Sequence, residues 1–353
     1  DGEYVDGRHP ESVQYTSSLT EDLRRRDFTI NAMAYSDETG LVDMFDGRED
    51  LKRGIIRCVG QAHERFTEDA LRMMRAVRFS AQLGFSLEEN TAQAIKELSE
   101  TITKISHERV RDELTKLLIS DNPGHVTMLY ELGLTRYIFP EFDDMMACEQ
   151  NTKYHCYSVG VHTVKVVEGV PANVDMRYAA LLHDVGKIYS KKTVDGVDHF
   201  WGHAAISEER ARVFLRDMRF DNETIRRVCI LVKYHDSRIE PTPRAMRRLI
   251  NRVGMENMDD LFDIMYADLA AKSEYSQRFK SSIDNLKSIY EEVRDQNDCV
   301  SIKNLAVNGG DLIGIGIPAG RHLGEVLNAL LEVVMEDPSQ NEKDKLLELA
   351  KNM

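Results

Sequence analysis

Repeated helix starts and stops are the feature of this sequence that most constrains its fold. From Thr67 to the end of the 353-residue chain, apolar residues recur at helical spacing between capping residues, glycines and prolines. In FTEDALRMMRAVRFSAQLGF, for example, we expect Thr67 to cap a helix and Gly84 to end it. Residues 12–60 instead mix strand-like runs with turns and a helix-like stretch, NAMAY, as in a small α/β domain. The sequence therefore predicts a mainly α chain that begins with an α/β portion.

Composition excludes several classes of protein. With 42% hydrophobic and 30% charged residues, the chain can bury a core and is neither disordered nor collagenous. No apolar run approaches the roughly 18 to 20 residues of a membrane span, and no leader precedes the first residue, so we expect a cytoplasmic protein without membrane partners. The five cysteines include no C-x-x-C pair, which favours reduced, buried thiols over disulfides or a thiolate zinc site.

The charge balance bears on nucleic-acid binding. Lys and Arg total 46 and Asp and Glu total 60, which gives a net charge of −14, so any polyanion must meet a local basic patch. The helix-like PRAMRRLINR offers one patch, although a solvated helix face is the alternative. The glycines of NGGDLIGIGIPAG (308–320) predict a turn whose backbone N–H groups can approach a phosphate. Candidate residues for RNA contact are Arg244, Arg247, Arg248, Arg252, Lys303 and Arg321.

A row of charged residues in EDALRMMRAVR points to a nucleotide. Asp69, Arg72, Arg75 and Arg78 recur every third residue, so on a helix they form a slanted row that can follow an extended ligand. A carboxylate beside a guanidinium offers an acceptor next to donors, which matches the Watson–Crick edge of cytosine or adenine but not that of guanine or uracil. The alternative is ordinary helix chemistry, because acidic residues favour a first turn and Glu68 with Arg72 is a common i,i+4 pair.

A second set, of histidines and aspartates, is typical of a divalent-metal site. Its imidazoles and carboxylates suit Mn²⁺, Fe²⁺, Ni²⁺, Zn²⁺ or Mg²⁺ without choosing between them. One or two such ions would lower the pKa of a bound water and present hydroxide to a phosphorus atom, and Lys187 would neutralise the phosphate. For His155 and His203, a hydrogen-bonded core histidine is the alternative. The candidate ligands are His162, His183, Asp184, His203, His235 and Asp268.

Long stretches of the sequence resemble one known family. DLRRRDFTINAMAY, DMFDGREDLKRGIIRCVG and RFTEDALRMMRAVRFSAQLGFSL are similar to the class II tRNA nucleotidyltransferases, or CCA-adding enzymes, and the bacterial poly(A) polymerases. The match continues through HDVGK (183–187), which resembles the HD superfamily of metal-dependent phosphohydrolases, and through LAVNGGDLIGIGIPAG. The resemblance implies a nucleotidyltransferase that adds CCA, or part of it, to tRNA 3′ ends with CTP, ATP and Mg²⁺.

The resemblance also implies roles for individual residues. The incoming nucleotide would lie beside Arg26, Asp27 and Asn31. CTP and ATP would be selected by a protein template made of Asp69 and Arg72, and the rest of the nucleotide would be held by Arg75 and Arg78. The helical tail would recognise tRNA.

One departure from the family pattern concerns the transfer chemistry. The family uses a Gly-Ser motif followed by an Asp-x-Asp pair that holds two Mg²⁺ ions, and neither motif occurs here. Asp43 and Asp46 in VDMFDG are expected to be turn and loop residues rather than substitutes. We therefore expect a truncated α/β nucleotidyltransferase head that lacks the catalytic Asp pair (1–60), a helical neck and body with the nucleotide-selecting helix (61–145), an HD domain (146–272) and a helical tail (273–353).

Three other functions stay open at this point. In the first, the enzyme adds only A, as poly(A) polymerases do, and CTP is not incorporated. In the second, it is chiefly an HD phosphohydrolase that acts on 2′,3′-cyclic phosphate or 2′-phosphate ends of RNA, and the chain binds metal. In the third, it is a non-catalytic RNA-binding protein, and neither site turns over substrate.

Overall fold

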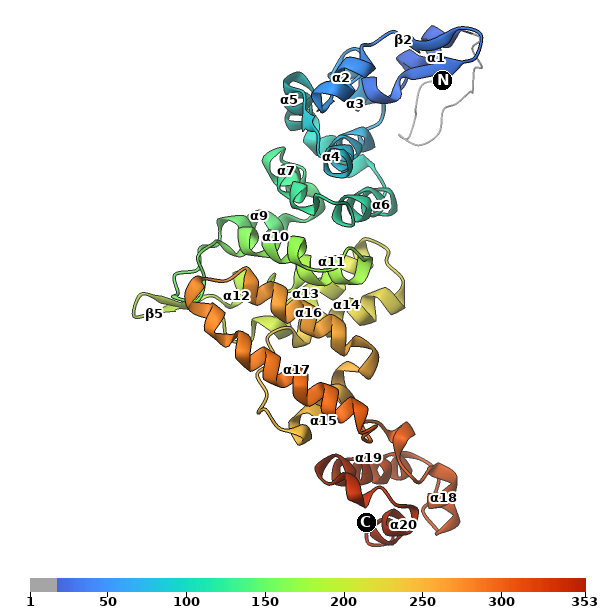
Figure 1. The fold of residues 1–353 in the computed structure, drawn as a ribbon, viewed down its shortest axis with the longest axis vertical. Coiled ribbons are helices and arrows are strands. Elements are labelled where there is room, and N and C mark those ends of the chain that lie inside the picture. Colours follow the sequence, from blue (N-terminus) through green and yellow to red (C-terminus); the bar gives the residue numbers. More distant parts are fainter. Residues whose placement is uncertain (1–17) are drawn as a thin grey trace. The chain divides into compact units, whose positions relative to one another are not determined.

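The computed structural model describes residues 18–353, and helices make up most of its regular structure (Figure 1). The strand expected at residues 13–17 lies outside the described residues. The chain divides into two compact units, one containing the residues up to 233 together with 270–276, and the other containing 234–269 and 277–353. Within residues 18–353, no helix has both the length and the apolar character needed to cross a membrane. The mainly helical fold class is confirmed.

The first unit begins with short strands among short helices, as the sequence predicts. A two-stranded antiparallel sheet pairs Met33 with Asp43, and a parallel pair joins residues 55–56 to residues 86–87. NAMAY is not a helix, because it ends a 3₁₀ turn (Thr29–Asn31) and then enters a strand. Pairing across the hairpin outweighs the helix preference of Ala and Met. These elements are α1 (Leu19–Arg24), β1 (Met33–Ser36), β2 (Gly40–Asp43), α2 (Gly47–Arg53), β3 (Ile55–Ile56) and β4 (Ser86–Leu87).

The stretch containing the charged row forms two helices rather than one, α3 (Ala62–Glu68) and α4 (Leu71–Leu83). The prediction that Thr67 caps a helix is wrong, since Thr67 lies inside α3 and its hydroxyl donates to the carbonyl of His63 at 2.7 Å. Asp69 makes the break with extended backbone, and its carboxylate accepts from the Leu71 N–H at 3.0 Å. Gly84 ends α4 at φ +68°, as predicted.

The rest of the first unit is a helical body with one hairpin. Helix α4 packs against α6, and α10 packs against α9 and α11. Side chains on these helices, including Met73, Val77, Leu117 and Val166, are fully buried. Each stabilises the fold by about 1.5–3 kcal/mol relative to an exposed position. The elements are α5 (Glu89–Leu98), α6 (His107–Leu118), α7 (Val126–Glu131), α8 (Thr135–Ile138), α9 (Pro140–Ala147), α10 (Val159–Gly169), α11 (Val174–Leu182), α12 (Lys187–Ser190), β5 (Lys192–Val194), β6 (Val197–His199), α13 (His203–Asp217) and α14 (Asn222–Tyr234), whose last residue belongs to the second unit.

The second unit is helical and contains the glycine-rich stretch 308–320. The first part of that stretch is a helix rather than the predicted turn, because Asn308 and Asp311 form a reciprocal capping box. Its Leu312 is buried with Leu330 and Leu346 in the core of the C-terminal helices. The elements are α15 (Pro243–Val253), α16 (Met258–Ala270, whose last residue belongs to the first unit), α17 (Lys280–Asp295), α18 (Gly309–Gly314), α19 (Arg321–Glu336) and α20 (Lys343–Ala350).

The arginines of α15 hold the second unit together. Arg247 is buried, donates to the Met335 carbonyl at 2.7 Å and pairs with Asp298 at 2.8 Å. Two exposed neighbours pair with acidic residues of α19, Arg244 with Glu336 at 2.5 Å and Arg248 with Glu332 at 2.9 Å. The prediction that this row forms an RNA-binding patch is therefore wrong for Arg247, whose guanidinium is used inside the fold.

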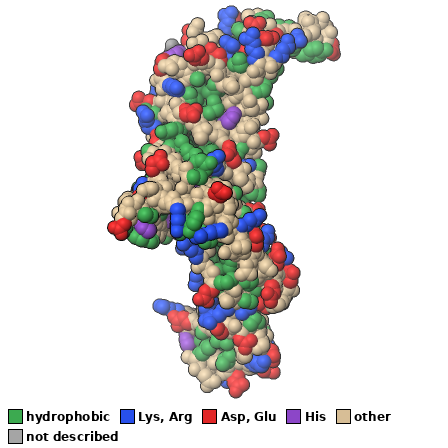
Figure 2. All heavy atoms as spheres, turned by 60° about the vertical axis from the view of Figure 1, so that its left-hand side comes forward, with side chains coloured by type: hydrophobic (Ala, Val, Ile, Leu, Met, Phe, Trp, Pro, Cys, Tyr) green, Lys and Arg blue, Asp and Glu red, His purple; other side chains and the backbone are tan. Residues whose placement is uncertain are grey.

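Charges of both signs are interspersed on the face shown in Figure 2, as expected for an acidic chain with local basic clusters. The five cysteines are free thiols, as predicted. The expectation that all are buried is wrong for Cys148, which is partly exposed, and for Cys156, which is exposed.

Candidate functional site

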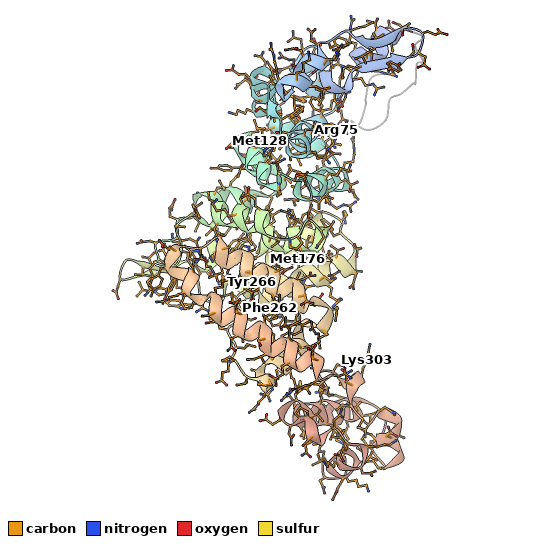
Figure 3. All side chains as sticks on the ribbon, viewed as in Figure 1. Arg75, Met128, Met176, Phe262, Tyr266 and Lys303 are labelled. Atoms are coloured by element: carbon orange, nitrogen blue, oxygen red, sulfur yellow. The ribbon has the colours of Figure 1, made fainter. Side chains whose placement is uncertain are left out.

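Asp27 is the centre of a polar cluster that joins the two stretches predicted to bind the nucleotide. Its Oδ1 accepts from the Phe28 N–H at 2.9 Å and from the Asn31 side-chain amide at 3.2 Å. Its Oδ2 accepts from Nε and Nη2 of Arg75 on α4 at 2.8 and 2.6 Å. Asp27 is only 8% exposed, so this two-pronged pair is partly shielded from water. Figure 3 labels Arg75 on α4.

Backbone pairing fixes the Asp27 segment in place. The Val59 N–H donates to the Asp27 carbonyl at 3.1 Å, and the Thr29 N–H donates to the Arg57 carbonyl at 2.9 Å. Asp27, Asn31 and Arg75 are therefore brought together although the chain separates Asp27 from Arg75 by 48 positions. Arg26 is more exposed and pairs with Asp22 at 3.4 Å.

Asp69 and Arg72 face different partners. Asp69 Oδ2 pairs with Arg109 on α6 at 3.0 Å. Arg72 pairs with Glu68 at 2.7 Å, and its Nη2 donates to the Arg25 carbonyl at 3.2 Å. Sequence reasoning missed Arg109, because a partner 40 positions away leaves no spacing signal. Both side chains of the Asp69–Arg109 pair are partly exposed to solvent.

Arg78 lies inside the protein. It is 8% exposed, pairs with Glu113 on α6 at 2.5 Å, and stacks on the Phe79 ring at 3.7 Å from the centroid. Burial lowers the pKa of Arg78, and Glu113 opposes this effect. The predicted row is thus divided, with Arg72 and Arg75 near the Asp27 segment and Arg78 in the α4–α6 core.

The two aspartates of VDMFDG are turn and loop residues, as predicted. The Asp43 carboxylate accepts from the N–H groups of Gly47 and Arg48, both at 2.9 Å. Burial alone would raise the pKa of Asp43, but these backbone donors outweigh it and hold the pKa below its usual value. Asp46 precedes α2 in a left-handed conformation. The magnesium-binding Asp pair that the family resemblance implies has no counterpart in the printed sequence.

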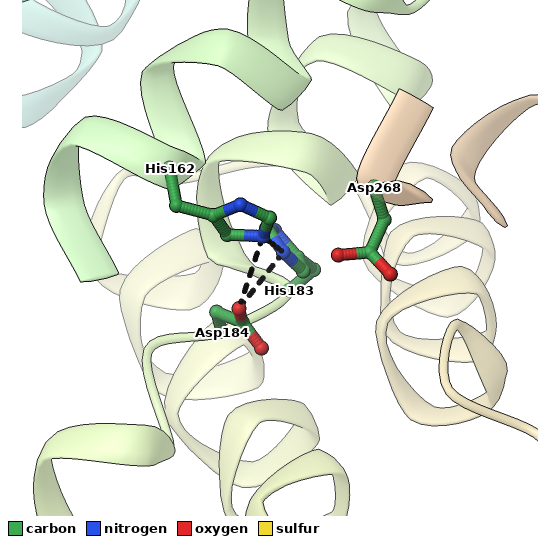
Figure 4. Close-up of side chains that lie close together, drawn as sticks. All are labelled: His162, His183, Asp184 and Asp268. Atoms are coloured by element: carbon green, nitrogen blue, oxygen red, sulfur yellow. Dashed lines mark hydrogen bonds and ion pairs between the residues drawn. The ribbon is translucent and has the colours of Figure 1, made fainter. Parts of the chain in front are cut away.

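Three histidines, two of them buried and His203 partly exposed, surround the buried Asp184 in the first unit. Helices α10, α11 and α13 bring the rings together, and Figure 4 shows two of them converging on the carboxylate. His162, His183 and Asp184 are at most 1% exposed. From the Asp184 carboxylate oxygens, the distances to Nε2 are 3.5 Å for His162, 3.1 Å for His183 and 3.4 Å for His203.

The other nitrogen of each ring faces a backbone carbonyl. These Nδ1 to oxygen distances are 3.3 Å from His162 to Ala271, 2.7 Å from His183 to Ala180 and 2.9 Å from His203 to Phe200. A carbonyl can only accept, so the Nδ1–H of each ring is the donor and Nε2 is the nitrogen that faces the cluster. Two of these Nε2 atoms lie 3.4 Å apart. Imidazole nitrogens that converge on a carboxylate suit a divalent cation, and each carbonyl contact fixes the orientation of its ring.

Lys187 and His155 border this cluster. The Lys187 ammonium is 4% exposed, pairs with Asp184 at 2.6 Å and donates to Gln150 Oε1 at 2.9 Å. The His155 ring meets the His162 ring edge-on at 5.2 Å between centroids. Burial, with smaller effects of Lys187 and His162, lowers the pKa of His155 to about 2, so this ring is neutral.

The remaining predicted ligands, His235 and Asp268, belong to the second unit. Both are buried, His235 directly after α14 and Asp268 on α16, and Figure 4 draws Asp268 with the other side chains. Their inclusion in the ligand set remains a prediction from the sequence.

Comparison with known proteins assigns the chain to a family. Family models match at residues 1–57 ("Poly A polymerase head domain"), 84–146 ("Probable RNA and SrmB-binding site of polymerase A") and 199–350 (tRNA nucleotidyltransferase domain 2). The CCA-adding enzyme of Ligilactobacillus salivarius is 32% identical over 99% of this chain and 76% of its own length. The corresponding enzyme of Lactiplantibacillus plantarum is 32% identical over 99% of this chain and 75% of its own length.

A solved structure agrees with these relatives. The Bacillus stearothermophilus CCA-adding enzyme, crystallised in complex with CTP, superposes with a TM-score of 0.71 at 29% identity. The match covers 97% of this chain and 76% of that one. The identity and coverage of the relatives, and the shared fold, show that this chain belongs to the CCA-adding enzyme family.

Proposed function

We propose that this protein adds CCA to tRNA 3′ ends with CTP and ATP as substrates. The observation that carries the proposal is the meeting of Asp27, Asn31 and Arg75, which joins the two stretches expected to bind the nucleotide. Family membership supports the same reaction, since the relatives are CCA-adding enzymes and one was solved with CTP.

Asp69 and Arg72 are proposed to select the base. The carboxylate would accept the exocyclic amine of cytosine or adenine, and the guanidinium would donate to the adjacent ring nitrogen. Guanine and uracil present a ring N–H where these bases have an acceptor, so Arg72 would oppose a donor. Arg109 and Glu68, the present partners of this pair, would hold the two side chains until a base replaces part of each contact.

The Asp27 cluster is proposed to orient the rest of the nucleotide. Arg75 would bind the sugar or phosphate side while Asp27 fixes its guanidinium, and exposed Arg26 would add positive charge nearby. Buried Arg78 would hold α4 in position and would not touch the nucleotide. In this chemistry, Mg²⁺ activates the attacking hydroxyl and stabilises the leaving pyrophosphate. Because the sequence has no Asp-x-Asp pair, we assign no residue to that ion.

Incorporation of labelled CTP and ATP into a tRNA that lacks its CCA end tests this proposal. Incorporation of both nucleotides supports it, and incorporation of ATP alone favours the poly(A) polymerase alternative. Selective binding of CTP and ATP without incorporation supports nucleotide selection in a chain that lacks the catalytic aspartates. Absence of both binding and incorporation contradicts the proposal.

We also propose a metal-dependent phosphohydrolase site at Asp184. The observation in its favour is that three imidazole Nε2 atoms lie 3.1–3.5 Å from the oxygens of one buried carboxylate. His162, His183, Asp184 and His203 would hold one or two divalent ions, with His235 and Asp268 completing the set. A bound ion would lower the pKa of a coordinated water. Lys187, already beside Asp184, would neutralise a substrate phosphate.

Metal content tests this second proposal without relying on activity. We expect at least one divalent ion per chain by elemental mass spectrometry after dialysis, and affinity about 10- to 100-fold lower or worse in Asp184→Asn. Asp195→Asn is the matched control, because Asp195 lies in the β5–β6 turn with φ +51°, a conformation that Asn tolerates. Equal metal content in wild type and Asp184→Asn would contradict the site.

We also propose that the chain is organised in four parts. A nucleotidyltransferase head, a helical neck and body, an HD-like domain and a tRNA-contacting tail would divide at residues 60, 145 and 272. The family models at 1–57 and 84–146 support the first two parts.

A further inference from the structure

The loop 150–157 borders the His/Asp cluster on one side. Gln150 accepts the Lys187 hydrogen bond, and His155 packs against His162. The same loop is joined to the β5–β6 hairpin, because the Asn151 N–H donates to Asp198 Oδ2 at 2.8 Å. Residues carried by this loop are therefore fixed close to the atoms proposed to bind metal.

Lys153, Tyr154 and Tyr275 form an aromatic and basic surface on this border, here named the tyrosine platform. The two rings lie 5.6 Å apart between centroids. The Lys153 ammonium lies 5.3 Å from the Tyr154 centroid and 4.7 Å from the Tyr275 centroid. Tyr154 is 39% exposed and Tyr275 is 38% exposed, so part of each ring is open to solvent. All three residues belong to the first unit.

Hydrogen bonds from two serines hold the tyrosine platform in one arrangement. Ser273 donates from its hydroxyl to the Lys153 carbonyl at 2.7 Å and from its N–H to the Tyr154 carbonyl at 3.0 Å. Ser276, which is 1% exposed, donates to the same Tyr154 carbonyl at 2.9 Å. The backbone of both tyrosine-bearing segments is thus ordered before any ligand arrives, which lowers the entropy cost of binding.

The tyrosine platform is continuous with the His/Asp cluster through both of its segments. Tyr154 immediately precedes His155, and the Ala271 carbonyl that accepts from His162 Nδ1 is followed directly by Lys272. Both segments of the tyrosine platform therefore run directly into residues that contact the His/Asp cluster.

We propose that the tyrosine platform binds the single-stranded 3′ end of an RNA and presents its terminal phosphate to the His/Asp cluster. Bases stack on exposed aromatic rings whatever their identity, and lysines follow the phosphates, which is how proteins bind single strands without sequence preference. A free phosphate or small phosphate ester would need only Lys187 and the metal ligands. The presenting step rests on the proposed phosphohydrolase function, whereas the binding step does not.

Binding of a fluorescein-labelled heptauridylate to the full chain, followed by fluorescence anisotropy in a chelating buffer, tests the proposal. We expect Tyr154→Ala and Tyr275→Ala each to weaken binding about tenfold, while Tyr154→Phe and Tyr275→Phe keep it. Lys153→Gln should weaken binding and make the slope of log K against log salt shallower by about 0.7. Tyr137→Ala is the matched control, because Tyr137 is 36% exposed on α8, and it should bind like wild type.

Two results would overturn the proposal. Equal binding by wild type and both Tyr→Ala variants would remove the stacking role, and loss of binding in Arg72→Ala alone would assign the oligonucleotide to the nucleotide-selecting cluster. Circular dichroism of each variant separates a binding defect from misfolding. Asp184→Asn should bind the oligonucleotide normally, so failure of the metal proposal leaves this test intact.

Discussion

At the residue scale, the arginines of α4 differ in how far each is enclosed by the fold. Arg75 reaches outward to a carboxylate on another segment, whereas Arg78, one turn later, is enclosed with Glu113. Sequence spacing predicted both residues as ligand contacts. Spacing shows which side of a helix a residue faces, but it does not show whether another segment buries that side. Arg109 escaped prediction for the same reason, since only the folded chain brings α6 beside Asp69.

The Arg78–Glu113 pair gives a prediction on stability. Arg78→Met leaves a buried carboxylate with Lys116 as its remaining ion pair, so we expect the free energy of unfolding to fall by about 3–5 kcal/mol. Glu113→Leu added to Arg78→Met should restore most of that loss, because two apolar side chains replace the pair. Urea denaturation measures both effects. A loss in the double variant as large as the sum of the single losses would contradict this account.

The Asp27–Arg75 pair gives a prediction that separates binding from stability. Arg75→Ala removes two charge-assisted hydrogen bonds, so we expect a stability loss of about 1.5–3 kcal/mol together with weaker binding of CTP. Arg75→Lys should recover part of the stability but little of the binding, since an ammonium cannot form the two-pronged contact. Unchanged CTP affinity in folded Arg75→Ala would remove Arg75 from the proposed site.

At the scale of elements, local sequence predicted how helices end better than how they begin. Gly84 ends α4 as expected because a left-handed backbone is cheap for glycine wherever the chain lies. The predicted start of α4 was wrong because the helix breaks at Asp69, whose carboxylate accepts from the Leu71 N–H, and α4 begins only at Leu71. Residues 33–35 became a strand because residues 41–43 pair with them, which no helix preference reveals.

The β5–β6 hairpin gives a prediction on pH. Burial alone would raise the pKa of Asp198, but hydrogen bonds from Thr193, the Asn151 N–H and Lys191 lower it to about 2. Because the folded pKa lies below the usual 3.8, this carboxylate stabilises the fold above about pH 4 and loses that contribution as the pH falls towards 2. The stabilisation is about 2 kcal/mol.

The test compares unfolding free energies of wild type and Asp198→Asn between pH 2 and pH 5. Wild type should lose more stability than the variant over this range. Parallel pH profiles for the two proteins would show that Asp198 does not carry the effect. Asp195→Asn, in the exposed turn of the same hairpin, should follow wild type.

At the scale of the whole molecule, the residue types of both sites and the local Glu68–Arg72 pair were visible in the sequence, but the partners distant in the chain were not. The histidines around Asp184 were predicted from their chemistry and from the resemblance of HDVGK to the HD superfamily, and the structure adds the carbonyl contacts that fix each ring. We propose base selection by Asp69, which precedes α4, and by Arg72 on α4, together with a metal site in the helical body. The proposed nucleotide site depends on the claim that protein side chains select the base.

Isothermal titration calorimetry with each of the four nucleoside triphosphates tests that claim most directly. We expect CTP and ATP to bind at least about tenfold more tightly than GTP and UTP, the discrimination expected from a well-placed pair of hydrogen bonds. Asp69→Ala should lose this preference while remaining folded. Equal affinity for all four nucleotides in wild type, or a preference that survives in Asp69→Ala, would show that Asp69 does not select the base.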